Sequence, residues 1–212
     1  MLHKGLLCRY SGYFNAALTG RFSEAQAGIV ELRGLEPHIF KHFHDWLYTQ
    51  KLPSIRREDV KEKQSPETFW DREKQEIVDL YAFGLCRICP ELVNAVINML
   101  VHKLPRKSLI PCAEYAYNNE ATSGTPLCRL LVDKARQCTR QSLLERLEPS
   151  SEKSLEVHSA FANEILYAFF KHGSAPPAIE ASSYFLGTSG SGRDTSTVAA
   201  GVRTKEEAES IV

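Results

Sequence analysis

Two histidines, His38 and His42, stand four residues apart in the segment Glu-Pro-His-Ile-Phe-Lys-His-Phe-His-Asp. A spacing of four places two side chains on one face of a helix, where they can chelate a metal ion. A catalytic metal site also needs a third ligand and an open coordination position. His44 and Asp45 are close in sequence but point around the helix from the pair. The pattern indicates a polar, solvent-facing helix side; a small metal-dependent enzyme using His38 and His42 is the alternative.

The cysteines offer one pair with the spacing of a zinc or redox motif, Cys86 and Cys89. A structural zinc site would need a second pair at comparable spacing, and a thioredoxin-like motif would follow a strand. The chain has no such second pair, and Cys86 and Cys89 end a helical stretch. We therefore expect small, buried hydrophobic roles in a reducing compartment for most of the six cysteines, which are Cys8, Cys86, Cys89, Cys112, Cys128 and Cys138.

Other catalytic signatures are incomplete. The segment Gly-Thr-Ser-Gly-Ser-Gly-Arg-Asp at 187–194 is glycine-rich like a phosphate-binding loop. It lacks the Lys-Ser/Thr of a P-loop, and no strand precedes it. No Gly-x-Ser-x-Gly elbow is present. The sequence predicts a protein that is not an enzyme and that uses no cofactor or metal.

The chain has 212 residues, 43% of them hydrophobic, with 26 basic and 26 acidic side chains. This balanced charge gives no reason to expect binding to nucleic acid or to an anionic membrane. No apolar run approaches the ~20 residues of a membrane span, and the N-terminus lacks the features of a signal peptide. We expect an intracellular protein, in the cytoplasm or the nucleus.

Apolar periodicity predicts the elements of the first half. Two short helices meet at Ser11-Gly12, and Gly20 is placed to end the second, in the left-handed conformation that glycine accepts. A short strand is expected from Gly28 to Leu32. Pro37 suits the first turn of a helix that ends near Tyr48. The apolar positions of that helix are Ile39, Phe40, Phe43, Trp46 and Leu47.

The second half is predicted to be helical, with a disordered end. Residues 54–76 include 13 charged side chains and read as a solvated insertion, a loop or an exposed helix. Beyond Gly173 the chain is rich in Ser, Gly and Ala, which predicts a disordered tail with a brief helix near 205–209. The apolar positions of the helices between them are Ile77, Leu80, Tyr81 and Leu85; Val93, Val96, Ile97, Leu100, Val101 and Leu104; Leu127, Leu130, Leu131 and Ala135; Leu143, Leu144 and Leu147; and Phe161, Ile165, Leu166 and Phe169.

Short motifs in the N-terminal part resemble those of the BTB/POZ domain, particularly its fungal branch. The family pattern is an apolar-His-Lys helix, a Ser-x-Tyr-Phe segment, a short strand, and an acidic-Pro-x-x-Phe helix that closes on apolar-Tyr-Thr. The positions that match this pattern are Leu2-His3-Lys4, Leu7, Ser11-Gly12-Tyr13-Phe14, Val30-Glu31-Leu32, Glu36-Pro37, Phe40 and Leu47-Tyr48-Thr49.

The resemblance implies a non-catalytic protein-interaction module that forms dimers or higher oligomers. Many members recruit cullin-based ubiquitin ligases, and these often carry an apolar-x-Glu motif in the loop after the second short helix. Phe22, Ser23 and Glu24 occupy that place and are the predicted partner-binding residues. Family members normally begin with a β-hairpin, whereas this chain begins at the His-Lys helix. We therefore expect that hairpin to be missing and a homodimer to be weakened.

These observations predict a mainly α fold, an α+β remnant with one short strand. The expected divisions are a truncated BTB/POZ-like domain over residues 1–104 with the insertion at 54–76, a helical extension over 105–172 and a tail over 173–212. The predicted function is an interaction module, with a cullin as one candidate partner. The metal-dependent enzyme and a decayed fragment without independent function remain the alternatives.

Overall fold

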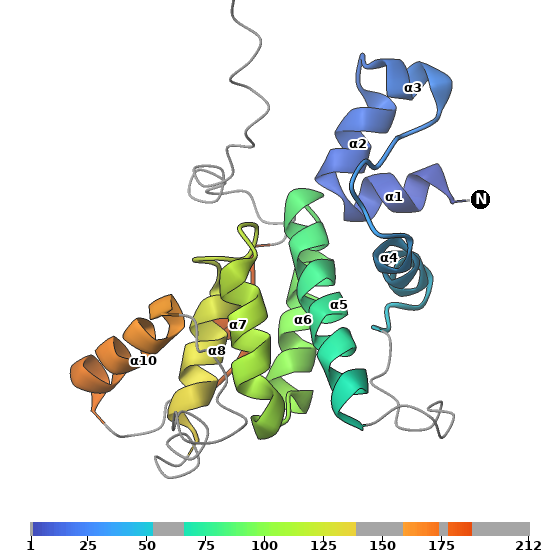
Figure 1. Cartoon of the computed structure of the whole chain (residues 1–212). Helices are drawn as coiled ribbons and strands as arrows, with labels where there is room; N and C mark the ends of the chain where they lie inside the picture. The colour runs from blue at the N-terminus through green and yellow to red at the C-terminus, as the bar shows by residue number, and fades with distance from the viewer. Residues whose placement is uncertain (1, 53–65, 139–158, 174–177, 188–212) are drawn as a thin grey trace, which may run out of the picture.

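Helices make up the regular structure of the described chain (Figure 1). The computed structural model describes residues 2–52, 66–138, 159–173 and 178–187, except for the side chains of 66–74 and Lys107. The mainly α fold predicted from the sequence is confirmed. The elements in chain order are α1 (Lys4–Tyr10), α2 (Gly12–Thr19), α3 (Ser23–Ala27), α4 (Pro37–Thr49), α5 (Pro66–Cys86), α6 (Pro90–Lys103), η1 (Arg106–Ser108), α7 (Leu109–Asn118), α8 (Pro126–Arg136), α10 (Ser159–His172) and η2 (Ala181–Tyr184), where η denotes a 3₁₀ helix.

The helices α5, α6, α7 and α8 stand side by side as a bundle (Figure 1). Helix α10 covers α7 and α8 at one edge of this bundle, and α4 packs on α5 at the other edge. Helices α1 and α2 lie beyond α4, with α3 farthest from the bundle. The two ends of the molecule are therefore formed by α3 and by α10.

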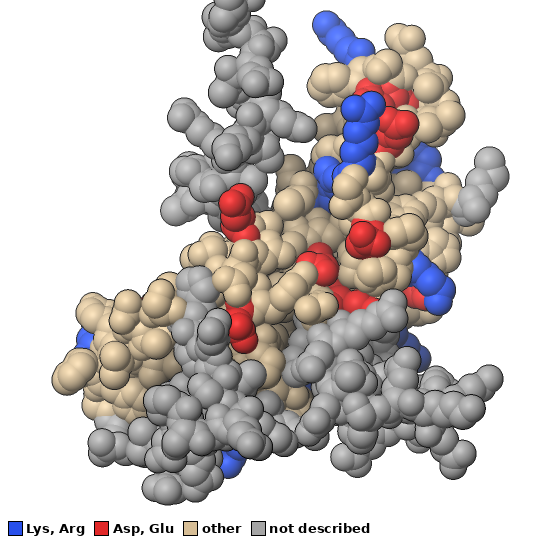
Figure 2. Space-filling model, in the orientation of Figure 1, with Lys and Arg blue, Asp and Glu red and all other residues tan. Residues whose placement is uncertain are grey.

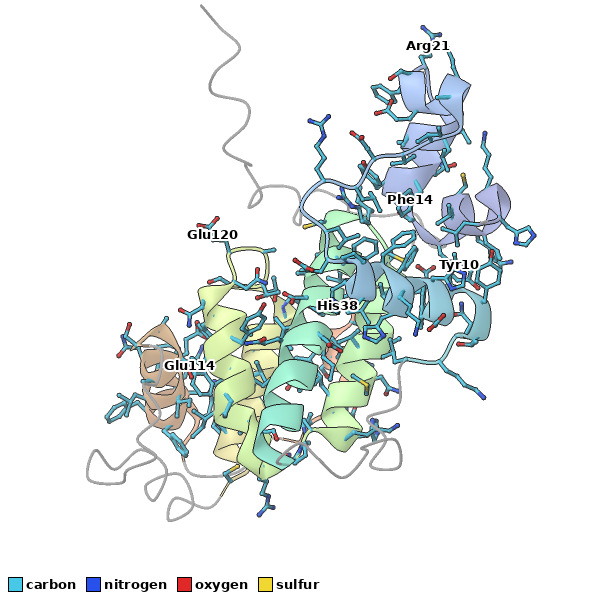
Figure 3. The ribbon with its side chains drawn as sticks, turned by 45° about the vertical axis from the view of Figure 1, so that its right-hand side comes forward. Tyr10, Phe14, Arg21, His38, Glu114 and Glu120 are labelled. Carbon is cyan, nitrogen blue, oxygen red and sulfur yellow. The ribbon has the colours of Figure 1, made fainter. Side chains whose placement is uncertain are left out.

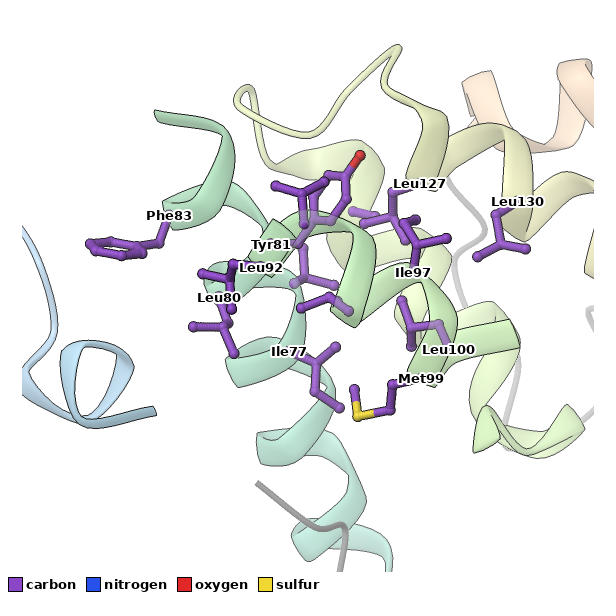
Figure 4. Packing of buried hydrophobic residues seen from close by; sticks show 14 of the residues in the cluster. Ile77, Leu80, Tyr81, Phe83, Leu92, Ile97, Met99, Leu100, Leu127 and Leu130 are labelled. Carbon is purple, nitrogen blue, oxygen red and sulfur yellow. The ribbon is translucent and has the colours of Figure 1, made fainter. Parts of the chain in front are cut away.

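One apolar core runs through the bundle and into the N-terminal helices. Within the bundle, α5 packs on α6 and on α7, and α7 packs on α8. Figure 4 shows apolar side chains of α5, α6 and α8 in this core, among them Leu80, Leu92 and Leu127. The core continues across the boundary predicted at residues 104 and 105, because α5 packs on α7 as well as on α6. Fully buried side chains from both sides of that boundary include Phe43, Trp46, Leu80, Tyr81, Leu92, Ile97, Leu127 and Phe161.

Helix α4 (Pro37–Thr49) begins and ends close to the residues that its sequence predicts. Pro37 occupies its first turn, where a missing backbone donor costs nothing, and Gln50 ends it in a left-handed conformation with φ of 55°. The helix ends one residue after the predicted Tyr48. Four of its five predicted apolar positions are buried, and Phe40 is half-buried.

The strand expected from Gly28 to Leu32 does not form. Gly28 instead caps α3 with φ of 63°, and residues 29–32 have no strand assignment in the described structure. Val30 and Leu32 pack against the core, whereas Ile29 and Glu31 are exposed. Exposure therefore alternates along this segment, as it would in a half-buried strand. A strand also needs a hydrogen-bonded neighbour, and no described segment pairs with this one.

The structure bears on three further expectations. Gly20 follows α2, but its φ of −74° is not left-handed. Residues 66–76 of the predicted insertion form the first part of α5, while 54–65 lie outside the described residues. Residues 178–187 correct the expectation of a disordered tail, because they pack on α6 and α8 and bury Tyr184. The helix marked by Leu143, Leu144 and Leu147 and the one near 205–209 also lie outside the described residues.

Candidate protein-interaction surface

The corner between α2 and α3 presents Phe22 to solvent. The Phe22 side chain is 60% exposed and precedes the first residue of α3. A Cβ built on Gly20 would lie 3.1 Å from Phe22 Cδ2 and would also meet the Ala16 carbonyl. Glycine at position 20 therefore lets the chain turn closely against α2 and carry the aromatic ring outward. Figure 3 shows Arg21, the preceding residue, at the outer tip of this corner.

Ser23 and Glu24 lie beside Phe22 in the first turn of α3. The Ser23 hydroxyl donates to Glu24 Oε2 at 3.1 Å, and Glu24 is half-buried. A carboxylate in the first turn interacts favourably with the helix dipole. Helix α3 has no buried residue, so all three predicted partner-binding residues lie on a part of the molecule that the core leaves uncovered.

Ile29 extends this surface and was not singled out from the sequence. Its side chain is 69% exposed, and it follows the left-handed Gly28 at the end of α3. The five residues of α3 span about 7 Å at 1.5 Å per residue. Phe22 and Ile29 therefore flank a short helix with two exposed apolar side chains. We call Phe22, Ser23, Glu24 and Ile29 the α3 corner.

The base of the α3 corner is fixed to the turn between α5 and α6. The Gly12 N–H donates to the Ile88 carbonyl at 2.9 Å, and the Arg87 guanidinium lies 4.3 Å from the centroid of the Tyr13 ring. The Ser11 hydroxyl donates to the Arg87 carbonyl and accepts from the Phe14 N–H at 3.2 Å. Helix α2 is thus held at its first residues, while its far end carries the corner.

Aromatic packing completes this support. The ring of Phe14 stacks on Phe43 of α4 with centroids 6.0 Å apart, and Phe43 contacts Phe83 of α5 at 5.0 Å. Figure 3 shows Phe14 between α2 and the rest of the molecule. The α3 corner is therefore an exposed tip on a rigid, packed base.

The histidine pair does not assemble a metal site. The rings of His38 and His42 are 6.4 Å apart, but His42 Nε2 lies 3.2 Å from Glu76 Oε2 and links α4 to α5. His44 Nδ1 contacts Asp45 at 3.1 Å. Across the described residues, no group of three or more His, Cys, Asp and Glu is arranged to hold a metal ion.

The carboxylate of Asp79 lies at the contact between α5 and α7. The Tyr115 hydroxyl is 2.9 and 3.1 Å from the two Asp79 carboxylate oxygens, and it donates to that group. Burial raises the pKa of Asp79 above its usual value, and the hydrogen bond from Tyr115 opposes that shift. The hydrogen bond from Tyr115 thus stabilises a half-buried carboxylate, and the role of Asp79 in this arrangement is structural.

The Cys86 and Cys89 pair is divided by burial. Cys86 is exposed at the end of α5, whereas Cys89 is 1% exposed, and burial raises the pKa of its thiol to about 12. All six cysteines are free thiols. Cys89, Cys112 and Cys128 are buried, Cys8 and Cys138 are half-buried, and Cys86 is exposed. The expectation that most of the six are buried therefore holds for three of them.

Helix α10 carries a second exposed apolar surface. Phe161 faces the bundle and is buried, but Leu166, Tyr167 and Phe170 face solvent, with Phe170 89% exposed. Figure 2 shows a mostly uncharged surface at this end of the molecule, with a basic side chain at its left edge, and charges of both signs over the α1–α3 end. The sequence predicts Leu166 on the apolar stripe of this helix. Leu166 is exposed because the helix has apolar residues on two opposite faces, and only one of these faces packs on the bundle.

The N-terminal helices lie in the part of the chain that is similar to a known domain family. Residues 1–63 match the BTB/POZ domain. The match covers 63 of the 212 residues, and α1 to α4 lie within it. The BTB/POZ resemblance predicted over residues 1–104 is confirmed for this part.

A stretch of 50 residues is 42% identical to human Kelch-like protein 30. It covers 24% of this chain and 9% of that protein, so this chain corresponds to a small part of its relative. No solved structure matches the chain. None of the described helices is long and apolar enough to cross a membrane.

Proposed function

We propose that the chain is a non-catalytic protein-interaction module whose α3 corner binds a partner. The observation that carries the proposal is the exposure of Phe22 beside Glu24, within the segment that matches the BTB/POZ domain. An exposed aromatic residue on a rigid base is a favourable contact point, because it buries a large apolar area at little entropic cost. The fungal-type character expected from the sequence stays part of this proposal.

The proposed partner is the N-terminal helical region of a cullin, with this chain as ubiquitin-ligase adaptor. Phe22 and Glu24 have the apolar-x-Glu pattern that the family resemblance associates with that role. The surface offers an aromatic ring and a carboxylate side by side, which suits an apolar pocket rimmed by basic groups. Ile29, at the other end of α3, would enlarge the apolar contact.

Homodimer formation is a second proposed property, supported by the BTB/POZ match alone. Sedimentation equilibrium of the chain at increasing concentration measures it. A mass that stays at one chain over the whole range would contradict it.

The proposed place of action is inside the cell, in the cytoplasm or nucleus. The six free thiols support this, because reducing compartments keep cysteines unpaired.

A pull-down with an immobilised cullin N-terminal region tests the adaptor role. The wild-type chain should be retained and Phe22→Asp should be lost, because a charge replaces the exposed ring. Phe170→Asp is the matched control, since Phe170 is also exposed but lies on α10 at the opposite end of the molecule. Equal retention of Phe22→Asp and the wild type would contradict the proposed contact.

A further inference from the structure

Residues 178–187 cross the surface of α6 and α8 as a short strap. The strap contains the single turn η2, and its flanking residues Glu180 and Phe185 have extended backbones, with φ, ψ of −106°, 127° and −74°, 144°. In the described chain its main helix contacts are with α6 and α8. The strap therefore lies on the bundle much as a bound peptide lies on a receptor.

The bundle recognises the backbone of this strap. The Asn94 side chain donates from Nδ2 to the Leu186 carbonyl at 2.9 Å and accepts at Oδ1 from the Leu186 N–H at 2.7 Å. Arg129 donates to the Ser183 carbonyl at 2.9 Å. These three hydrogen bonds would form with any residue at positions 183 and, proline apart, 186. Main-chain hydrogen bonds of this kind give affinity in peptide recognition, and side-chain pockets give specificity.

One side chain of the strap is deeply anchored. Tyr184 is 4% exposed, and its hydroxyl donates to Asp133 Oδ2 at 2.7 Å. The Arg129 guanidinium lies 5.4 Å from the centroid of the Tyr184 ring. Ile179 and Leu186 are half-buried against the core. We call the surface of α6 and α8 that the strap covers the groove. It holds a tyrosine ring in the apolar core with a carboxylate at its hydroxyl, and it contacts aliphatic residues five positions before and two positions after that tyrosine.

The remaining strap residues contribute little to the contact. Phe185, next to the anchor, is among the exposed large hydrophobic residues, and Ser182 and Ser183 are also exposed. A segment held by one buried side chain and a few hydrogen bonds opens at a lower free energy than the helices beneath it. A free peptide with the same anchors can then compete for the groove.

We propose that the groove between α6 and α8 is a binding site for an extended peptide with the pattern aliphatic-x4-Tyr-x-aliphatic. Residues 179–186 of this chain occupy it in cis, and the ligand in trans is a partner segment with the same pattern. The site shares no residue with the α3 corner, so the proposed peptide binding does not depend on the adaptor role. A covalently linked segment has a high effective concentration, so the groove opens to a partner only when the strap is displaced.

The test uses a fluorescent peptide of residues 178–187 and the full-length chain. Tyr184→Ala in the chain removes the cis anchor while leaving the groove intact. Fluorescence anisotropy should show saturable binding to this variant that is at least about tenfold tighter than to the wild type, whose own strap competes. The same peptide with Tyr184 replaced by alanine, and a chain with both Tyr184→Ala and Asn94→Ala, should each bind at least about tenfold more weakly. Absence of saturable binding to a Tyr184→Ala chain that melts cooperatively would overturn the proposal.

Hydrogen exchange of the unmodified chain gives a second test that does not depend on the variant folding. The Leu186 amide, bonded to Asn94, should exchange through a local opening that is insensitive to low denaturant. The amides at the centre of α6 should exchange only through larger openings. Exchange of Leu186 at the same free energy as α6 would make the strap an inseparable part of the core and would also overturn the proposal.

Discussion

The Ser11 hydroxyl donates a hydrogen bond to the backbone carbonyl of Arg87, 76 residues later in the chain. The same hydroxyl accepts from the Phe14 N–H and so caps α2. The buried Ser11 side chain therefore accepts from a free N–H in the first turn of α2 and links this helix to the turn between α5 and α6. Through this bond the helices that match the BTB/POZ domain are held on the bundle that follows them.

Ser11→Ala should lower the free energy of unfolding by about 1–2 kcal/mol, because it removes the cap of α2 and the hydroxyl hydrogen bond to the Arg87 carbonyl. That carbonyl would keep only the long contact from the Tyr13 N–H, at 3.4 Å. Urea denaturation followed by circular dichroism measures this. Ser23→Ala is the matched control, since the exposed Ser23 hydroxyl bonds only to the neighbouring Glu24 in the described structure. Equal midpoints for the two variants would show that the Ser11 bond does not fix α2.

Two helical glycines should respond to alanine in opposite directions. A Cβ at Gly84 in α5 would lie 2.8 Å from Val93 Cγ2, and Val93 is a stiff, fully buried side chain. Gly84→Ala should therefore cost about 1–3 kcal/mol by overpacking α5 against α6, despite the better helix propensity of alanine. Gly5 in α1 has no atom within 4 Å of a built Cβ, so Gly5→Ala should stabilise by up to about 1 kcal/mol. Thermal denaturation of both variants measures the pair, and a stabilised Gly84→Ala would contradict the close contact.

The two cysteines of the Cys86 and Cys89 pair should differ in reactivity. At neutral pH an aromatic disulfide reagent should modify the exposed Cys86 quickly, whereas Cys89 should react only on unfolding, because burial raises its pKa and blocks access. Mass spectrometry of digested, timed samples identifies the labelled thiol. Rapid labelling of Cys89 in the folded chain, or a disulfide between the two, would support the redox role that the burial argues against.

Stability should fall as the pH rises from about 10 to about 12, in part because of Tyr115. Burial, the hydrogen bond donated to Asp79 and the Asp79 charge raise the pKa of Tyr115 to about 12, against 10.0 for an ordinary tyrosine. In this window the unfolded chain loses the phenolic proton and the folded chain keeps it. The folded state then binds more protons, and the free energy of unfolding decreases with pH. Other groups whose pKa values burial raises contribute in the same direction; they are Tyr81, Cys89, Tyr117, Cys128 and Tyr184.

Tyr115→Phe should make this alkaline decrease shallower, as measured by urea denaturation at a series of pH values. Asp79→Asn should bring the Tyr115 pKa back toward 10, because it removes the negative acceptor. An unchanged slope for Tyr115→Phe would mean that Tyr115 does not contribute to the pH dependence.

Most helices could be predicted because their signals are local. The apolar period, Pro37 and Pro90 at helix starts, and Pro105 after α6 all act within a few residues. Helix α7 was not predicted, although Pro111 in its first turn lacks only a donor that this turn leaves free. The strand predicted at residues 28–32 was wrong because a strand needs a hydrogen-bonded partner, and the residues of a single segment do not supply one.

The α3 corner was predicted only in part, because its motif is local whereas the exposure of its residues depends on the packing around them. Phe22 and Glu24 were recognised from a short motif, but the exposure of Phe22 depends on how Gly20 turns the chain against α2. The strap was missed because its one deep anchor, Tyr184, stands in a stretch poor in large apolar residues. Its partners Asn94 and Asp133 lie 90 and 51 residues earlier in the sequence, which no local pattern relates to Tyr184.

The most direct test of the central claim is the dissociation constant between the full-length chain and a cullin N-terminal region, measured by titration calorimetry. The wild type and Phe170→Asp should bind alike, and Phe22→Asp should bind at least about tenfold more weakly with an unchanged thermal unfolding curve. Equal dissociation constants for the wild type and Phe22→Asp would contradict the α3 corner as the contact. No binding by the folded wild type would contradict the cullin adaptor role itself.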